Sequence, residues 1–168
     1  FTNFSADGRI WALRSTDAGV TWTNDQAISA TASVQGAWPT VAPNGDVYVG
    51  WVRTGGGLAT IEIARSTDGG VSYSAVTSPS ANKTFPQNAT ASGNCGRAAL
   101  KGNIRYLPSP QLAVGPDGVL HTVYSYGPGG GDDCDSFYRR STDGGATWDV
   151  SFSFLTIRTS PPVLQPGL

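Results

Sequence analysis

The octapeptide Ser141-Thr142-Asp143-Gly144-Gly145-Ala146-Thr147-Trp148 decides how this chain is organised, because two other segments repeat it. Residues 66–73 read Ser-Thr-Asp-Gly-Gly-Val-Ser-Tyr, and residues 15–22 read Ser-Thr-Asp-Ala-Gly-Val-Thr-Trp. The shared pattern is Ser-Thr-Asp-x-Gly-x-Thr/Ser-aromatic. Self-similarity of this length indicates a chain built from repeated structural units.

Each copy is predicted to be the turn of an antiparallel β-hairpin, because an alternating run precedes it and another follows it. Aspartate bonds nearby backbone N–H groups in such turns, and glycine adopts positive φ without steric cost. The closing aromatic is expected to pack back over the hairpin. This local bonding explains the aspartates without catalysis. The predicted structural residues of the three turns are Ser15, Asp17, Gly19, Trp22, Ser66, Asp68, Gly70, Tyr73, Ser141, Asp143, Gly145 and Trp148.

The repeated pattern resembles the Asp-box, also called the BNR repeat, of sialidases and related β-propellers. The three copies with their flanking strands cover most of the chain. The resemblance implies an all-β fold, a partial β-propeller of four-stranded antiparallel blades, with Asp-box hairpin turns that lie away from any active site. That family also contains other glycosidases, receptors and assembly factors, so the motif points to the fold more than to an activity.

The strand pattern divides one propeller domain into consecutive blades. We expect residues 1–36 to form the outer half of a blade, 37–79 a second blade and 110–156 a third. Residues 80–109 are expected to be an inter-blade insertion loop, and 157–168 the start of a next blade or a tail. Closed propellers have about four to eight blades. We therefore expect other chains or further blades to complete the disc.

Connections between antiparallel strands alternate between two ends of each sheet. The Asn-Gly and Asp-Gly turns and the three repeats are expected to share one face of the disc. The Gly-rich loops 53–58 and 127–136 and the segment 74–109 are expected to share the other. Long loops on a rigid scaffold usually carry binding residues, so the long-loop face is the predicted binding face.

The composition narrows the classes of partner. The chain has 11 basic and 12 acidic residues among 168, a net charge of −1, and only 14% charged residues. This balance excludes the electrostatic footprint of a protein that binds nucleic acid or an anionic membrane. No apolar run approaches the roughly 20 residues of a membrane span. Because the chain starts at Phe1 without a methionine, we expect it to be processed or part of something larger.

Cys95 and Cys134 both fall on the predicted long-loop face and are expected to form a disulfide. Such a bridge would stabilise the fold by at most about 4 kcal/mol on the chain-entropy model. A disulfide, low charge and the absence of Met favour a secreted, extracellular protein.

The resemblance raises the possibility of sialidase-type catalysis. Such catalysis needs three arginines, a tyrosine with a glutamate base, and an aspartate acid/base. Arg105 stands before Tyr106-Leu107-Pro108, which resembles the family's Arg-Ile/Leu-Pro motif with one inserted residue. The alternative is a solvated basic loop. Tyr126 leads into the long-loop face and is a candidate sugar contact. Asp132 or Asp133 is the candidate acid/base if an enzyme exists.

Asp132, Asp133 and Asp135 also form an acidic group that would suit Ca²⁺, although their spacing does not match an EF-hand. The alternative is a solvated acidic loop, and no other cofactor is expected.

Two functions follow from these observations. The preferred one is a secreted, sialidase-like propeller segment that acts in extracellular binding or assembly, with carbohydrate as the first ligand. The alternative is part of an exo-sialidase or related glycoside hydrolase, whose catalytic set is incomplete in this chain.

Overall fold

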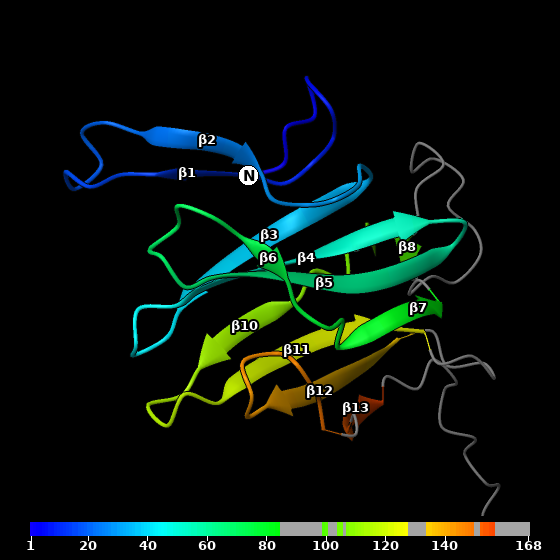
Figure 1. Cartoon of the computed structure of the whole chain (residues 1–168). Helices are drawn as coiled ribbons and strands as arrows, with labels where there is room; N and C mark the ends of the chain where they lie inside the picture. Colours follow the sequence, from blue (N-terminus) through cyan, green and yellow to red (C-terminus); the bar gives the residue numbers. More distant parts are fainter. Residues whose placement is uncertain (85–98, 101–103, 106, 128–133, 150–151, 157–168) are drawn as a thin grey trace, which may run out of the picture.

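The computed structural model describes residues 1–84, 99–100, 104–105, 107–127, 134–149 and 152–156. These residues form an all-β fold of antiparallel sheets (Figure 1). Among them, no helix is long and apolar enough to cross a membrane.

The first unit is a hairpin of β1 (Trp11–Arg14) and β2 (Thr23–Ala27), joined by the first repeated turn. The chain start lies along the other edge of β1, where Thr2 forms an isolated antiparallel bridge with Ile10. Three residues of the chain start therefore occupy part of that edge.

The second sheet has the strand order β3-β4-β5-β6, with β7 also pairing with β5. Its strands are β3 (Val34–Val41), β4 (Val47–Gly55), β5 (Leu58–Ser66), β6 (Ser74–Ala75) and β7 (Ser80–Thr84). Because β6 pairs with one end of β5 and β7 with the other, they act together as the outer strand.

Three sequence boundaries are corrected here. β3 begins at Val34, within the range expected to end the first unit. The predicted loop 53–58 is mostly strand, since β4 and β5 pair up to Gly55 and Leu58. Residues 80–84, predicted to be insertion loop, form β7 of the second sheet. Further along the same segment, β8 (Ala99–Leu100) pairs with β9 (Ile104–Arg105).

The third sheet has the order β10-β11-β12-β13. Its strands are β10 (Gln111–Val114), β11 (Leu120–Tyr126), β12 (Asp135–Ser141) and β13 (Phe152–Thr156). The predicted loop 127–136 therefore ends earlier, because Asp135 already starts β12.

The register places the connections at two opposite ends of each sheet. Val47 pairs with both Val41 and Ser66, so the turn at 42–46 lies beside the second repeated turn. Leu120 likewise pairs with Val114 and Ser141 in the third sheet. The β4–β5 turn lies at the far end of the second sheet, and the Tyr126–Asp135 pair lies at the far end of the third. This is the long-loop end of the sequence prediction.

Three buried clusters hold the units together. One joins the first hairpin to the second sheet through Ile10, Val34, Val49, Trp51 and Ala64. The other two join the second and third sheets, and include Val52, Ile61, Tyr124 and Phe137 in one and Tyr48, Ile63, Leu112 and Leu120 in the other. The apolar faces are thus buried between consecutive units.

Candidate functional site

The three repeated turns share one hydrogen-bond arrangement. In the third, the Ser141 hydroxyl donates to Asp143 Oδ1 (2.7 Å) and accepts from the Gly145 N–H (2.8 Å). The Thr147 N–H donates to Asp143 Oδ1 (2.9 Å), and the Thr147 hydroxyl donates to Oδ2 (2.6 Å). Equivalent bonds form in the first and second turns.

These bonds hold the aspartates ionised. Hydrogen bonds from the Thr21 hydroxyl, the Thr21 N–H and the Ser15 hydroxyl, in that order, lower the pKa of Asp17 from 3.8 to about 2. The corresponding bonds from Thr147 and Ser141 lower the pKa of Asp143 to about 2. The Ser72 hydroxyl lowers the pKa of Asp68 well below its usual value. A general acid or base works best when its pKa lies near the working pH. Carboxylates whose pKa lies this far below neutral pH fit the structural role predicted for the three turns.

The second turn lies against the outer strand of the first unit. The Asn24 side-chain amide donates to the backbone oxygens of Gly70 (3.0 Å) and Val71 (2.8 Å). The Gln26 amide also donates to Val71 O (2.9 Å). Both amides come from β2, so this turn is fastened to the unit that precedes it.

The third turn repeats this contact on the second unit. Gly145 O accepts from the Thr77 N–H (3.1 Å), and the Trp148 indole N–H donates to Thr77 O (2.7 Å). Trp148 also packs against the cluster between the second and third sheets. Trp22, the equivalent residue of the first turn, is 60% exposed. Trp22 does lie against its own turn, since a Cβ added to Gly19 would be 3.8 Å from its ring, but no outer strand of another unit covers it in the described residues.

The arginines before the first and second turns each reach a glycine of the following turn. A Cβ added to Gly69 would lie 4.0 Å from Arg14 Nη2, and one added to Gly144 would lie 2.7 Å from Arg65 Nη1. Arg65 is oriented by Asp46, whose Oδ2 accepts from its Nε (3.0 Å) and Nη2 (2.5 Å). A cleft of about 300 Å³ surrounds this ion pair at the tight-turn end of the sheets.

The long-loop end of the third sheet carries an aromatic stack. Tyr126 stacks on Phe137 with 3.8 Å between ring centroids, and Tyr124 lies beside both rings. The Lys83 ammonium lies 5.3 Å from the Tyr126 centroid. Burial raises the pKa of Tyr126. Its ring is therefore engaged by protein neighbours, and the exposed Lys83 is the group that this cluster offers to solvent.

Among the candidate catalytic residues, only Tyr126 has a described side chain. Asp132 and Asp133 lie outside the described residues. Arg105 is in β9, and only its backbone is described. Their roles in catalysis stay predictions.

The predicted calcium site and disulfide are only partly covered by the described residues. Asp135 is 7% exposed at the start of β12, where it pairs with Tyr126 across the sheet. In the described part of the chain, no group of three His, Cys, Asp or Glu side chains could hold a metal. Cys134 is buried, whereas Cys95 lies outside the described residues. Calcium binding and the disulfide stay predictions.

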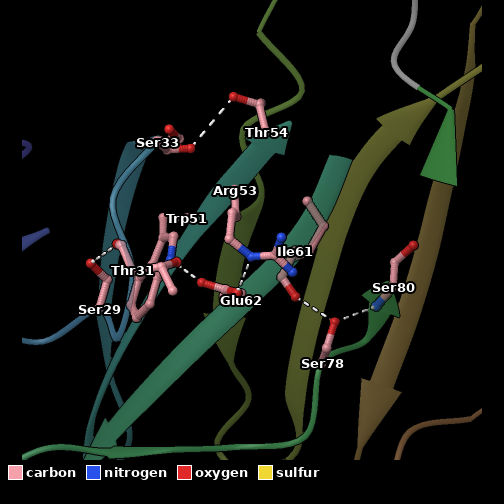
Figure 2. A network of polar contacts seen from close by, with 10 residues as sticks. All are labelled: Ser29, Thr31, Ser33, Trp51, Arg53, Thr54, Ile61, Glu62, Ser78 and Ser80. Atoms are coloured by element: carbon pink, nitrogen blue, oxygen red, sulfur yellow. Dashed lines mark hydrogen bonds and ion pairs between the residues drawn. The ribbon is translucent and has the colours of Figure 1, made fainter. Parts of the chain in front are cut away.

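One polar cluster was missed from the sequence. Glu62 accepts from the Trp51 indole N–H (2.8 Å) and from Arg53 Nε (2.6 Å), as Figure 2 shows. All three side chains lie on the face of β4 and β5 that packs toward the first hairpin. The Gly56-Gly57 turn could have revealed this cluster, because a two-residue hairpin pairing Gly55 with Leu58 also pairs Trp51 with Glu62.

A larger cleft, of about 490 Å³, lies between the first hairpin and the second sheet. Phe1, Trp11 and Leu13 line one side, and Pro39 and Val49 line the other. Its size falls within the range of ligand-binding pockets, which is about 300–1,000 Å³.

No family model and no curated protein matches the chain. Among solved structures, an α-L-arabinanase of Penicillium chrysogenum complexed with arabinobiose is similar, with a TM-score of 0.45 and 20% identity over 70% of this chain and 31% of that one. A protein of unknown function from Dyadobacter fermentans has a TM-score of 0.34 and 15% identity over 85% of this chain and 57% of that one. The chain spans about a third of the length of the arabinanase.

Proposed function

We propose that this chain is a run of consecutive blades from a secreted, sialidase-like Asp-box propeller that acts in extracellular binding or assembly. The observation that carries the proposal is that the second and third repeated turns are each hydrogen-bonded to the unit that precedes them. The second turn is fastened to β2, and the third turn to Thr77 beside β6. Contact only between neighbouring units is typical of proteins built by radial or linear repetition.

The two complete sheets support the same proposal. Both are antiparallel and have their strands in sequence order, and both present the repeated turn after the third strand. Corresponding positions face the unit that comes before their own sheet. Trp51 is buried toward the first hairpin, and Tyr124 is buried toward the second sheet. Equivalent topology and equivalent faces are what consecutive blades require.

The exposed first turn provides the test of assembly. If turns of this kind dock on outer strands, the chain should associate with another repeat-bearing chain or with itself, and Trp22→Ala should weaken that association. Sedimentation equilibrium measures the native mass. Phe4→Ala is the matched control, because Phe4 is 72% exposed but lies outside the repeat. Association that is equally weakened by both variants, or no association at all, would contradict the assembly role.

Carbohydrate is the first ligand to test, because Lys83 and Tyr126 lie at the long-loop end, with the charged group outermost. An ammonium there favours acidic sugars. We expect binding on a glycan array that falls with Lys83→Gln and is unchanged by Arg9→Gln, since Arg9 is in the first unit. Glycan binding that neither substitution changes would argue against this site.

The alternative is that the chain belongs to an exo-sialidase or related glycoside hydrolase. It is favoured by the position of Arg105 in β9, shortly before the first strand of the third sheet. Hydrolysis of a fluorogenic sialoside that is lost in Arg105→Ala, and kept in Arg9→Ala, would replace the binding proposal with the enzymatic one.

A further inference from the structure

The cleft of about 300 Å³ at the tight-turn end lies between the second and third units. The β3–β4 turn, with Pro43 and Asn44, lines one side, and the β10–β11 turn, with Pro116 and Asp117, lines the other. Figure 1 shows both turns at the same end of their sheets. Because each turn joins two paired strands, the cleft is bounded on both sides by complete hairpins.

Two nearly buried polar side chains line this cleft and have unused hydrogen-bonding capacity. Tyr48 is 3% exposed, and Asp46 is 6% exposed. Arg65 occupies only Oδ2 of Asp46, through its Nε and Nη2. Over the described ranges of the chain, neither Asp46 Oδ1 nor the Tyr48 hydroxyl forms a hydrogen bond. Since buried polar groups are nearly always hydrogen-bonded, two exceptions in one cleft favour a ligand there.

The Tyr48 hydroxyl and the remaining nitrogen of Arg65 converge at Gly144 of the third repeated turn. A Cβ added to Gly144 would lie 2.7 Å from Arg65 Nη1 and 3.3 Å from the Tyr48 oxygen. Gly144 has φ +71°, where other residues are strained, so glycine leaves room for the guanidinium and the hydroxyl to lie together. Burial raises the pKa of Tyr48 and keeps its hydroxyl protonated. The hydroxyl can therefore both donate and accept a hydrogen bond.

The turn itself does not require either buried group. The β3–β4 and β10–β11 turns make equivalent backbone hydrogen bonds. In the third sheet, however, Val119 occupies the position of Asp46, as the strand pairing shows. His121 likewise occupies the position of Tyr48. The carboxylate and the phenol therefore belong to this one cleft and are not part of the repeated turn pattern.

The charges of the cleft disfavour an anion. The Arg65 guanidinium is paired with Asp46, and Asp117 adds a second carboxylate to the lining. The lining therefore has a net negative charge, which repels a phosphate or a carboxylate ligand. A cation would lie beside Arg65 Nη1, which donates hydrogen bonds and accepts none. A neutral ligand avoids both costs.

The ligand must also combine donors with acceptors. Asp46 Oδ1 and Asp117 accept hydrogen bonds. Arg65 Nη1 and the Asn44 amide nitrogen donate them, while Asn44 Oδ1 is already bonded to a backbone N–H (3.1 Å). Adjacent hydroxyl groups do both within a small volume, and the two prolines of the lining offer apolar surface to C–H groups. The volume is at the lower end of the range for ligand pockets, which suits a single ring.

We propose that the cleft between the second and third units binds one ring of a neutral sugar through adjacent hydroxyl groups. One hydroxyl donates to Asp46 Oδ1, and its neighbour accepts from Arg65 Nη1 and bonds the Tyr48 hydroxyl. The site is at the opposite end of the sheets from Lys83. It does not depend on the function proposed above, and its ligand is neutral whereas the sugar expected at Lys83 is acidic.

The probes are the methyl glycosides of glucose, galactose and mannose, each titrated into the isotope-labelled full chain and followed by amide NMR shifts. At least one is expected to give saturable shifts at Gly118 and Gly144, which line the cleft, and none at Gly56 in the β4–β5 turn. Methyl glucuronide, which differs from the glucoside by a carboxylate, is expected to bind about fivefold more weakly or less. No saturable shift at Gly118 and Gly144 with any of the three, or tighter binding of the glucuronide, would overturn the proposal.

Tyr48→Phe removes the buried hydroxyl and keeps the ring. It is expected to weaken glycoside binding about fivefold, as the loss of one hydrogen bond does. The melting temperature of the free chain should not fall, because the hydroxyl has no partner among the described residues. Tyr138→Phe is the matched control, since Tyr138 follows Phe137 in β12 and so lies on the opposite face of the third sheet. Equal affinities of the wild-type chain and Tyr48→Phe would contradict the proposal.

Asn44→Asp gives a second arm that keeps the turn. Asp117 stands at the same position of the β10–β11 turn, and its Oδ1 accepts from the N–H two residues on (3.2 Å), as Asn44 Oδ1 does. The substitution replaces a donor with a charged acceptor, so it is expected to weaken glycoside binding by a similar factor. Binding that is lost in Lys83→Gln and kept in Asn44→Asp would assign the sugar to the long-loop end and would overturn this proposal.

Discussion

The contact between the second and third sheets is closed, whereas the contact between the first hairpin and the second sheet is open. In the closed contact, Tyr124 and Phe137 are buried and Trp148 is bonded to Thr77. In the open contact, a cleft of about 490 Å³ lies beside β1, and Trp22 is 60% exposed. The same repeated turn therefore stands in two environments within one chain.

The chemistry of the two facing surfaces differs in the same way. Tyr124 and Phe137 in the third sheet occupy the positions of Trp51 and Glu62 in the second, as the strand pairing shows. Where the neighbouring unit is complete, the position holds an aromatic ring. Where only a hairpin covers the sheet, the position holds a glutamate satisfied by Trp51 and Arg53. A charge needs such partners when it is partly buried.

The largest expected difference in stability between the two contacts comes from the glycine at the fifth position of the repeat, which is Gly19 in the first turn and Gly145 in the third. Gly145→Ala places a Cβ 2.9 Å from Val76 Cβ at φ +95°, whereas Gly19→Ala at φ +89° meets nothing nearer than 3.8 Å. Gly145→Ala should destabilise by about 3 kcal/mol, from backbone strain and overpacking together. Gly19→Ala should cost only the strain, about 1 kcal/mol. Urea unfolding measures both, and equal losses would mean that the third turn is not docked as described.

The closing aromatics give the next largest difference. Trp148→Ala removes a half-buried indole and its bond to Thr77, and should cost about 2 kcal/mol or more. Trp22→Ala should change the free energy of unfolding by about 0.5 kcal/mol or less, as exposed positions do. Thermal unfolding followed by circular dichroism provides the check. A large loss in Trp22→Ala would reveal packing on the first turn.

The arginines before the turns should differ less. Arg65 bonds Asp46, which is 6% exposed, and lies against Gly144 of the next turn. Arg140 pairs with Asp149, and both side chains are about half exposed. Arg65→Ala should cost about 1–3 kcal/mol, because Asp46 loses a partner while buried. Arg140→Ala should cost about 0–1 kcal/mol. Chemical denaturation in low and in 1 M salt sharpens the test, since only the Arg140 pair should be salt-sensitive.

The smallest expected effect is a pH dependence of the turns. The folded pKa of Asp17 and of Asp143 lies near 2, below the ordinary 3.8. A lowered folded pKa stabilises the fold above pH 3.8, and this contribution is lost as the pH falls toward about 2. Asp143→Asn and Asp17→Asn should each reduce the dependence of the melting temperature on pH between 3.8 and about 2. If neither does, the turn hydroxyls do not hold these carboxylates ionised.

One part of the candidate site could have been predicted from the sequence, although residues 53–58 were expected to be a loop. The position of Glu62 opposite Trp51 follows from the two-residue turn at Gly56-Gly57, since hairpin length sets register. The role of Thr77 could not be predicted from the sequence. Its N–H donates to Gly145 O only because two units that are far apart in sequence pack together. The same applies to β7, whose pairing with β5 depends on a chain path through a segment with no repeat signal.

The sequence by itself determined the three hairpin turns, their internal bonding and the antiparallel strand order, because these depend on residues within a few positions of each other. The tertiary structure alone decided which turn is docked and which is exposed. Those features depend on whether a neighbouring unit covers a given face, and identical local patterns such as Ser15–Trp22 and Ser141–Trp148 contain no information about their neighbours.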